Sequence, residues 1–158
     1  MASILKGQSG QPIQFETKPN VNGDDVLTRP EIVGTVSQSG GVPTGAIIQR
    51  GSNANGEFVR YADGTQICTF KGDTSDFQIT SPYGNLFQGV LNFTLPSAFI
   101  NSNYVVQSSV RYGNGASWSQ AAPSGNSSTI SNIQAFDIVS RPSGVTTNLA
   151  YMAIGRWF

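Results

Sequence analysis

The sequence predicts an all-β protein in which an extended N-terminal arm precedes a small antiparallel β-sandwich. Short runs rich in β-branched and aromatic residues are separated by Gly, Pro, Asn and Ser, at intervals typical of sandwiches and barrels. No stretch of about a dozen residues has apolar residues at positions i, i+3, i+4 and i+7, so almost no helix is expected. With 158 residues, the chain has the length of one ordinary domain, or of a small domain that carries an arm.

Residues 1–45 are predicted to form the arm, and residues 46–158 the sandwich. The arm holds four of the eight prolines, which are Pro12, Pro19, Pro30 and Pro43. Because proline lacks a backbone donor, this segment cannot build much sheet by itself. Residues 13–17 are expected to form a short strand, and residues 21–26 to place a turn between short extended pieces. A hairpin of that size is marginal in water, so we expect the arm to be ordered only against another chain; a disordered tail is the alternative.

The first part of the sandwich is predicted to be a hairpin that turns at Asp63-Gly64. This dipeptide fits a two-residue type I′ turn, which would pair Val59 with Cys68. One face of the hairpin is then the more apolar and is assigned to the core, with Val59, Tyr61, Cys68 and Phe70 pointing inward.

Three further strands and a C-terminal strand follow from the alternation of apolar and polar residues. Leu91, Phe93 and Leu95 are expected to point inward from the first. The strand over residues 104–112 has Tyr104, Val106, Val110 and Tyr112 on one side. In the next strand, Phe136 and Ile138 are expected to point inward and Asp137 outward. Residues 149–158 are apolar on both faces apart from Arg156, which predicts a central strand or one covered by another subunit.

The composition excludes several classes of function. The chain contains no histidine, which removes Ser-His-Asp and Cys-His catalysis and the commonest transition-metal ligand. Its one cysteine, Cys68, is expected to be a buried apolar residue, and no zinc cage can form from it alone. The nine basic residues are scattered singly, so nucleic acid is not an expected partner. No apolar run approaches the roughly 18 residues that span a bilayer, so membrane insertion is not expected either.

We therefore expect a binding or structural protein without a cofactor or metal, and not an enzyme. Carboxylate chemistry is the remaining catalytic possibility, since glycoside hydrolysis requires two acids on either side of a sugar. Asp24 and Asp25 adjoin a turn in the arm, and Asp73 and Asp76 share a polar loop. For the second pair we expect a solvated loop in preference to a calcium site or a catalytic pair, because calcium requires six to eight oxygen ligands.

The loop from Tyr112 to Gln120 is the strongest candidate for a binding site. Two aromatic residues, Tyr112 and Trp118, are surrounded there by small polar residues such as Asn114. An aromatic face covers the apolar side of a pyranose, while polar side chains hydrogen-bond its hydroxyls. Arg111, Asp137 and Arg141 are candidates for the polar rim of this glycan site, or are exposed members of ion pairs. The alternative for Trp118 is that it packs into the core or a subunit interface.

Three segments resemble virion proteins of phages. Gly51–Cys68 resembles a stretch that recurs in phage tail-fibre and related virion fibre proteins, and Tyr151–Phe158 is similar to their usual C-terminus. Pro19–Gly23 resembles the Pro-x-Val-Asn-Gly pieces that precede a terminal domain in such fibres. In addition, Phe93 with Pro96, then Phe136, then Tyr151-x-Ala153-x-Gly155 resembles the H-type lectin domain, which is a small trimeric β-sandwich that binds sugars near its subunit interfaces.

These resemblances imply a homotrimeric fibre on the head or tail surface of the virion. The arm would attach to a capsid or tail protein, with Ile4, Leu5, Ile13 and Phe15 as candidate anchors, and the sandwich would bind host-surface polysaccharide. An arm of residues 1–45 reaches at most about 150 Å, so a short fibre is expected. No ligand residue is carried over from the lectins, because many have Trp where Tyr151 stands and some use histidines.

Two other functions are consistent with the same sequence. A capsid decoration or fibre protein without receptor binding would hold Trp118 inside an interface. A depolymerase is disfavoured, because the chain lacks room for the long β-helix that such spikes usually resemble.

Overall fold

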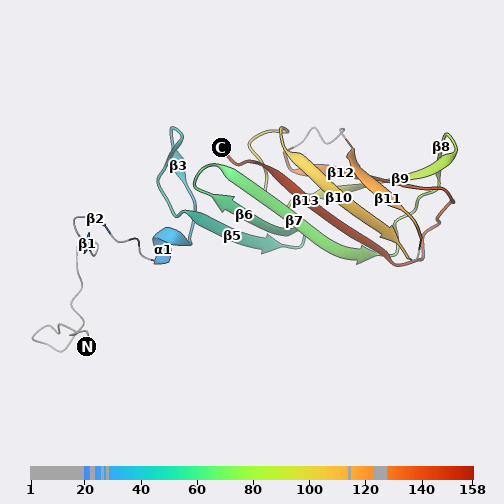
Figure 1. The fold of residues 1–158 in the computed structure, drawn as a ribbon, viewed down its shortest axis with the longest axis horizontal. Helices are drawn as coiled ribbons and strands as arrows, with labels where there is room; N and C mark the ends of the chain where they lie inside the picture. The colour runs from blue at the N-terminus through green and yellow to red at the C-terminus, as the bar shows by residue number, and fades with distance from the viewer. Residues whose placement is uncertain (1–19, 22–23, 26, 28, 114, 123–127) are drawn as a thin grey trace, which may run out of the picture.

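The computed structural model describes residues 20–21, 24–25, 27, 29–113, 115–122 and 128–158 (Figure 1). Within this part of the chain the only helix is the single turn α1 (Arg29–Ile32), which confirms the prediction of almost no helix. Two short strand pairs precede the main sheets, β1 (Asn20–Val21) with β2 (Asp24–Asp25) and β3 (Gln38–Ser39) with β4 (Val42–Pro43). The predicted strand over residues 13–17 lies outside the described residues.

Two antiparallel sheets form the body of the molecule, which confirms the predicted all-β sandwich (Figure 1). The five-stranded sheet has the order β10-β13-β7-β6-β5, and the four-stranded sheet has the order β11-β12-β9-β8. The strands of the first sheet are β5 (Ile48–Asn53), β6 (Gly56–Tyr61), β7 (Thr65–Thr74), β10 (Val105–Tyr112) and β13 (Thr147–Arg156). Those of the second are β8 (Ser81–Tyr83), β9 (Leu86–Thr94), β11 (Trp118–Ala122) and β12 (Ile130–Asp137).

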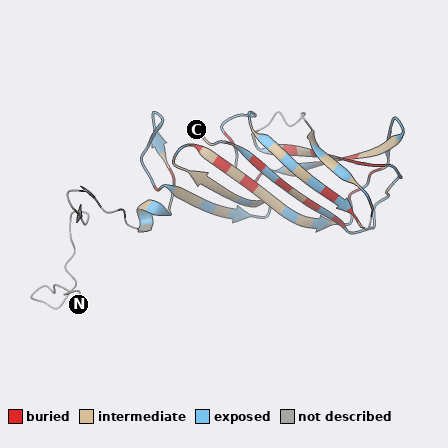
Figure 2. Ribbon diagram, in the orientation of Figure 1, coloured by how far each residue is buried: buried red, intermediate tan, exposed pale blue. Residues whose placement is uncertain are grey.

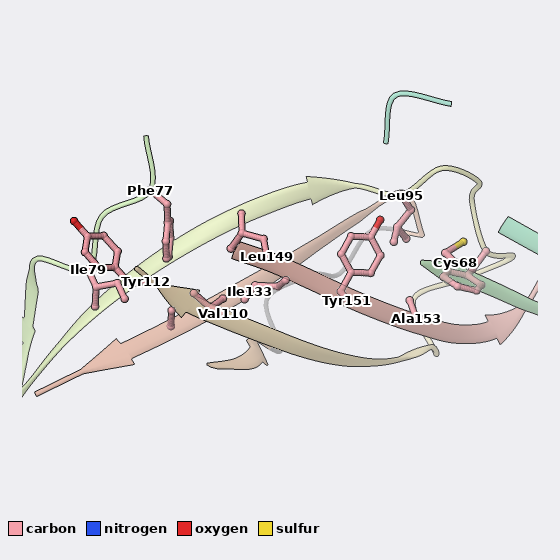
Figure 3. Close-up of a cluster of buried hydrophobic side chains, with 12 residues drawn as sticks. Cys68, Phe77, Ile79, Leu95, Val110, Tyr112, Ile133, Leu149, Tyr151 and Ala153 are labelled. Carbon is pink, nitrogen blue, oxygen red and sulfur yellow. The ribbon is translucent and has the colours of Figure 1, made fainter. Parts of the chain in front are cut away.

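One hydrophobic core lies between the two sheets. It extends from Cys68 and Ala153 at one end to Ile79 and Tyr112 at the other, with Ile133 near its middle (Figure 3). Along the strands, buried residues alternate with more exposed ones, as a half-buried pleated sheet requires (Figure 2). The prediction that Cys68 is a buried apolar residue is confirmed, and burial raises the pKa of its thiol.

Two of the predicted strands have the expected inward faces, and the C-terminal strand has the expected central position. The first strand, β9 with the residue that follows it, directs three apolar side chains to the core: Leu91, Phe93 and Leu95. The second, β10 with the residue before it, directs four: Tyr104, Val106, Val110 and Tyr112. β13 lies between β10 and β7, so the C-terminal run is a central strand as its apolar composition predicted.

The predicted register of the β6–β7 hairpin is wrong by one residue. Cys68 is paired with Phe58 instead of Val59, because the turn is longer than a two-residue loop. The amide of Gly64 donates to the carbonyl of Tyr61 over 3.0 Å, and Gly64 has a φ of 91°. A shift of one residue exchanges the two faces of a strand. Phe58 therefore points inward, whereas Val59 and Tyr61 lie on the outer face; Cys68 and Phe70 point inward as predicted.

The predicted faces of β12 are also wrong. Ile133 and Ala135 are fully buried, and the same alternation brings Asp137 inward, where its side chain has no exposed surface. Ile138 is exposed, and Phe136 lies on the outer face of the four-stranded sheet. The strand is ambiguous in sequence because apolar residues occupy both of its faces.

Val33 and Gly34 lie against the start of β5, which is the edge strand of the five-stranded sheet. Val33 forms a parallel bridge with Ile48, and the amide of Gly34 donates to the carbonyl of Ile48 over 3.0 Å. The amide of Ile47 donates in turn to the carbonyl of Glu31. These bonds occupy part of an edge that would otherwise present unpaired backbone groups.

Candidate functional site

The outer face of the four-stranded sheet carries a row of aromatic rings beside a row of amides. We call this the aromatic–amide face and define it by Tyr83, Gln88, Trp118, Gln120, Gln134 and Phe136. Trp118 pairs with Phe136 and Gln120 with Gln134 between β11 and β12, and Phe136 pairs with Gln88 between β12 and β9. Since residues at i and i+2 of a strand share a face, these pairings place the rings and the amides side by side.

Three rings follow one another across the face. Trp118 stacks on Phe136 with ring centroids 6.1 Å apart and planes inclined by 24°. Tyr83 contacts the same Phe136 ring at 5.6 Å with an inclination of 55°. Phe136 is only 8% exposed, whereas Trp118 is 46% and Tyr83 54% exposed. The central ring thus supports two outer rings that present apolar surface to solvent.

Three glutamine side chains form a hydrogen-bonded chain next to the rings. The Nε2 of Gln120 donates to the Oε1 of Gln134 over 3.2 Å, and the Nε2 of Gln134 donates to the Oε1 of Gln88. An amide carries one acceptor oxygen and two donor hydrogens. The chain therefore ends in an oxygen acceptor on Gln120 and in donor hydrogens on Gln88, both next to aromatic rings.

The face is uncharged. Its other described side chains are Ser81, Leu86, Val90, Asn92, Thr94 and Asn132, none of which ionises. The outer face of the five-stranded sheet differs, because Arg50, Glu57, Lys71, Asp73 and Arg111 lie there in register. Among the described residues, charged side chains therefore lie on the outer face of the five-stranded sheet and not on that of the four-stranded sheet.

The structure does not bring the predicted loop site together. Tyr112 is a core residue whose hydroxyl donates to the carbonyl of Pro142, and Arg111 is exposed on the outer face of the five-stranded sheet. Trp118 is exposed on the opposite sheet, so it does not pack into the core. Asn114 lies outside the described residues. Among the predicted glycan residues that the structure describes, Trp118 is the one that lies on the aromatic–amide face.

Asp137 and Arg141 form a buried anchor for loops. The carboxylate of Asp137 accepts from the Nε of Arg141 at 2.9 Å, from the hydroxyl of Ser117 at 2.8 Å and from the amide of Val139 at 2.9 Å. Arg141 also lies over the ring of Tyr112, 5.8 Å from its centroid. Burial raises the pKa of Asp137, but these hydrogen bonds outweigh it, so the pKa lies below its usual range. The pair organises structure and does not form an exposed rim.

The remaining candidates are not assembled into a site. Ile4, Leu5, Ile13 and Phe15 lie outside the described residues. Asp73 is exposed and accepts from the Nδ2 of Asn148 over 2.6 Å, and Asp76 is exposed in the following loop. In the described part of the chain, no three His, Cys, Asp or Glu side chains cluster as metal ligands would. No helix within the same ranges is long and apolar enough to cross a bilayer.

A second exposed surface crosses the five-stranded sheet. Four apolar residues face one another across neighbouring strands from β10 to β6: Val105, Ile154, Ile67 and Val59. Met152 lies two residues before Ile154 on the same face of β13. Val105 is 74% exposed, Met152 45% and Ile154 42%. We call these five residues the apolar row. Contiguous exposed apolar surface of this kind is a common feature of protein interfaces.

A concavity of about 490 Å³ lies beside the β5–β6 turn. Its lining includes Asn53, Phe70 and the charged side chains of Glu57 and Lys71. It is a charged alternative to the aromatic–amide face as a place for a ligand.

The sequence contains a signal for the aromatic–amide face beyond the exposed Trp118. Gln120 follows Trp118 by two residues, and Gln134 precedes Phe136 by two, so ring and amide share a face on either strand. Tyr83 offered no such signal, because it reaches Phe136 from a strand of only three residues.

Comparison with known proteins gives one similar structure. No protein-family model and no curated protein matches the chain. A search of solved structures finds the R1 pyocin fibre of P. aeruginosa, in a structure of its C-terminal residues 323–701, with 17% sequence identity and a TM-score of 0.45. The match covers 94% of this chain and 42% of the pyocin chain. A match at this level does not establish a shared function.

Proposed function

We propose that this protein is a short virion-fibre subunit whose arm attaches to the phage particle and whose sandwich binds glycans on the host surface. The exposed rings of Trp118 and Tyr83, stacked on Phe136 beside a row of amides, carry the proposal for glycan binding. Rings of this kind cover the apolar face of a sugar, and amides exchange hydrogen bonds with its hydroxyls. The role is one of binding and not of catalysis.

The assignment to a fibre has separate support. Gly51–Cys68 and Tyr151–Phe158 resemble stretches of phage fibre proteins, and the described chain is an antiparallel β-sandwich. The resemblance of residues 93–155 to H-type lectin domains also supports sugar binding. Attachment is assigned to Ile4, Leu5, Ile13 and Phe15, which lie in the proposed arm.

We also propose that the subunit is a homotrimer in which the apolar row lies against a neighbouring copy. Association through the five-stranded sheet would remove Val105, Met152 and Ile154 from water while leaving the opposite sheet free. Three equivalent glycan sites on one trimer would then raise the avidity for a polymeric surface without any new contact.

Glycan binding is tested with the full chain and its Trp118→Ala variant on an array of bacterial surface polysaccharides. We expect the wild type to bind and the variant to lose about fivefold or more in affinity, since a stacked ring contributes on the order of 1 kcal/mol or more. Gln78→Ala is the matched control, because Gln78 is exposed in the segment between β7 and β8 and belongs to neither sheet. Absence of binding to every polysaccharide of the host would contradict the proposal.

The same variant separates receptor binding from a purely structural role. If Trp118 were an interface residue, Trp118→Ala would change the oligomeric state measured by light scattering and not the affinity for glycans.

Deletion of residues 1–30 tests whether the arm attaches the protein to the phage particle. We expect particles assembled with the shortened chain to lack the fibre in electron micrographs, and particles that retain it would exclude this segment as the anchor.

A further inference from the structure

We propose that the aromatic–amide face binds internal segments of a neutral polysaccharide, laid across the strands from β11 to β8. This inference rests on the proposed glycan-binding function and specifies the class of glycan. It follows from the spacing of the rings, the direction of the amide chain and the distribution of charge.

The rings offer more than one stacking position. Trp118 lies on β11 and Tyr83 on β8, and both contact Phe136 between them, at 6.1 Å and 5.6 Å. The strands that carry the two exposed rings are three inter-strand spacings apart in the order β11-β12-β9-β8, which is about 14 Å at about 4.8 Å per spacing, and the buried ring of Phe136 contacts both rings. A ligand that contacts both must be an oligosaccharide segment, and a monosaccharide can use only one.

The open geometry selects the middle of a chain over its end. The rings and amides stand on a pleated sheet of four strands and not in a pocket built from loops. Trp118 comes from β11, next to the strand of Phe136, and Tyr83 comes from β8 at the other edge of the sheet, so the two exposed rings reach Phe136 from different strands. A polymer can then continue past both rings, and recognition needs no free chain terminus.

The amide chain supplies hydrogen bonds along the same direction. Gln120, Gln134 and Gln88 follow β11, β12 and β9 in order, parallel to the series of rings. Their mutual hydrogen bonds restrain the three side chains before any ligand arrives, so less rotamer entropy is lost on binding. The acceptor on Gln120 and the donors on Gln88 are suited to hydroxyl groups, which both donate and accept.

The absence of Asp, Glu, Lys and Arg side chains on the described part of this face selects a neutral polymer. A uronate, sulfate or phosphate group bound here would lose water without gaining a cation, and an unpaired charge is costly to desolvate. The positive charges of Arg50, Lys71 and Arg111 lie on the opposite sheet. Binding should accordingly be insensitive to salt, since screening acts on charge pairs.

The test measures binding of the full chain to soluble linear glucan, galactan and mannan by titration calorimetry, with alginate and pectate as anionic polymers. We expect a neutral polymer to bind, with an affinity that changes less than about twofold between 0.05 and 0.5 M salt. Trp118→Ala and Tyr83→Ala should each weaken it by about fivefold or more. Gln120→Ala should weaken it by about threefold or more, while Gln78→Ala, outside both sheets, leaves it unchanged.

The outcomes distinguish this inference from the proposed function. Binding to an anionic polymer with strong salt dependence, or loss of binding in Lys71→Ala but not in Trp118→Ala, would overturn the inference and leave glycan binding intact. Complete competition by the monosaccharide at the same molar concentration as the polymer's repeat units would exclude the requirement for an internal segment. A change of oligomeric state in both Trp118→Ala and Tyr83→Ala would assign the face to subunit contact. Failure of every glycan to bind would remove the proposed function itself. Thermal melts of each variant exclude unfolding as the cause of any loss.

Discussion

The carboxylate of Asp137 links two loop segments at one end of the sandwich. It accepts hydrogen bonds from Ser117, Val139 and Arg141, which belong to the loop before β11 and the segment after β12. The backbone of Arg141 is tied to Ile79 by bonds of 2.9 Å and 2.8 Å in both directions. The position of Trp118, which directly follows Ser117, is therefore linked to a charge inside the fold.

We predict that Asp137→Asn lowers the free energy of unfolding by about 1–3 kcal/mol at neutral pH, because an NH2 group then replaces one of two acceptor oxygens that face donors, and the guanidinium of Arg141 loses its counter-charge. The pKa of Asp137 lies below its unfolded value of about 3.9, so the stabilisation is complete above that pH. It is lost as the pH falls through the folded pKa. Urea denaturation from pH 7 to pH 2 should show the two proteins converging in acid. A constant difference between them would contradict the linkage.

Aromatic residues were the least predictable at the residue scale. Trp118 was identified as a candidate because it stands among small polar residues, and it is exposed. Tyr112 has a similar sequence environment, yet it is buried, because it is on the inward face of β10 and its hydroxyl finds a carbonyl acceptor at Pro142. A local pattern does not distinguish a ring that faces solvent from one whose polar end is satisfied inside.

At the scale of elements, strands were predicted correctly where one face alone is apolar. That condition holds for residues 91–95 and 104–112, and the fully apolar C-terminal run correctly indicated a central strand. It fails for β12, where Ile133 and Phe136 point to opposite faces. The hairpin failed for another reason, since Asp-Gly is compatible with both a two-residue loop and a longer turn with a bulge.

Gln66 is an unpredicted link between elements. It is fully buried in β7, and its Nε2 donates to the carbonyls of Ser97 and Ala98 over 3.1 Å each. Its Oε1 accepts from the Nε of Arg60 over 2.7 Å and from the hydroxyl of Ser97 over 3.3 Å. The amide thus joins the β6–β7 hairpin to the segment that follows β9.

We predict that Gln66→Leu lowers the free energy of unfolding by about 1–3 kcal/mol, despite the similar volume of leucine. The substitution removes the hydrogen bonds that the buried amide makes to the partly buried carbonyls of Ser97 and Ala98 and to the Nε of Arg60, and leucine replaces none of them. Chemical denaturation measures the loss. Gln78→Leu, at an exposed site between β7 and β8, should change stability by less than about 0.5 kcal/mol. Equal effects of the two substitutions would show that burial of the amide is not the cause.

At the scale of the whole molecule, the two outer faces of the sandwich have different chemistry. The five-stranded sheet carries charges and the apolar row, whereas the described four-stranded sheet carries rings and amides without charge. If copies associate through the first face, the second remains accessible on every copy. Such a division allows assembly and glycan binding to be changed independently by substitution.

We predict that Ile154→Lys dissociates the proposed homotrimer, because an ammonium group in the middle of the apolar row would have to be desolvated without a partner. Ile154 pairs with Val105 on one side and Ile67 on the other, so the charge cannot be moved away from the interface. Light scattering at micromolar concentration should report a trimer for the wild type and a monomer for the variant. Val90→Lys is the matched control, since Val90 is 54% exposed on the other sheet, and it should remain trimeric.

Monomeric Ile154→Lys should still bind an oligosaccharide with wild-type affinity, but should bind a polysaccharide-coated surface more weakly through loss of avidity. A trimeric Ile154→Lys protein would place the subunit contact elsewhere on the chain.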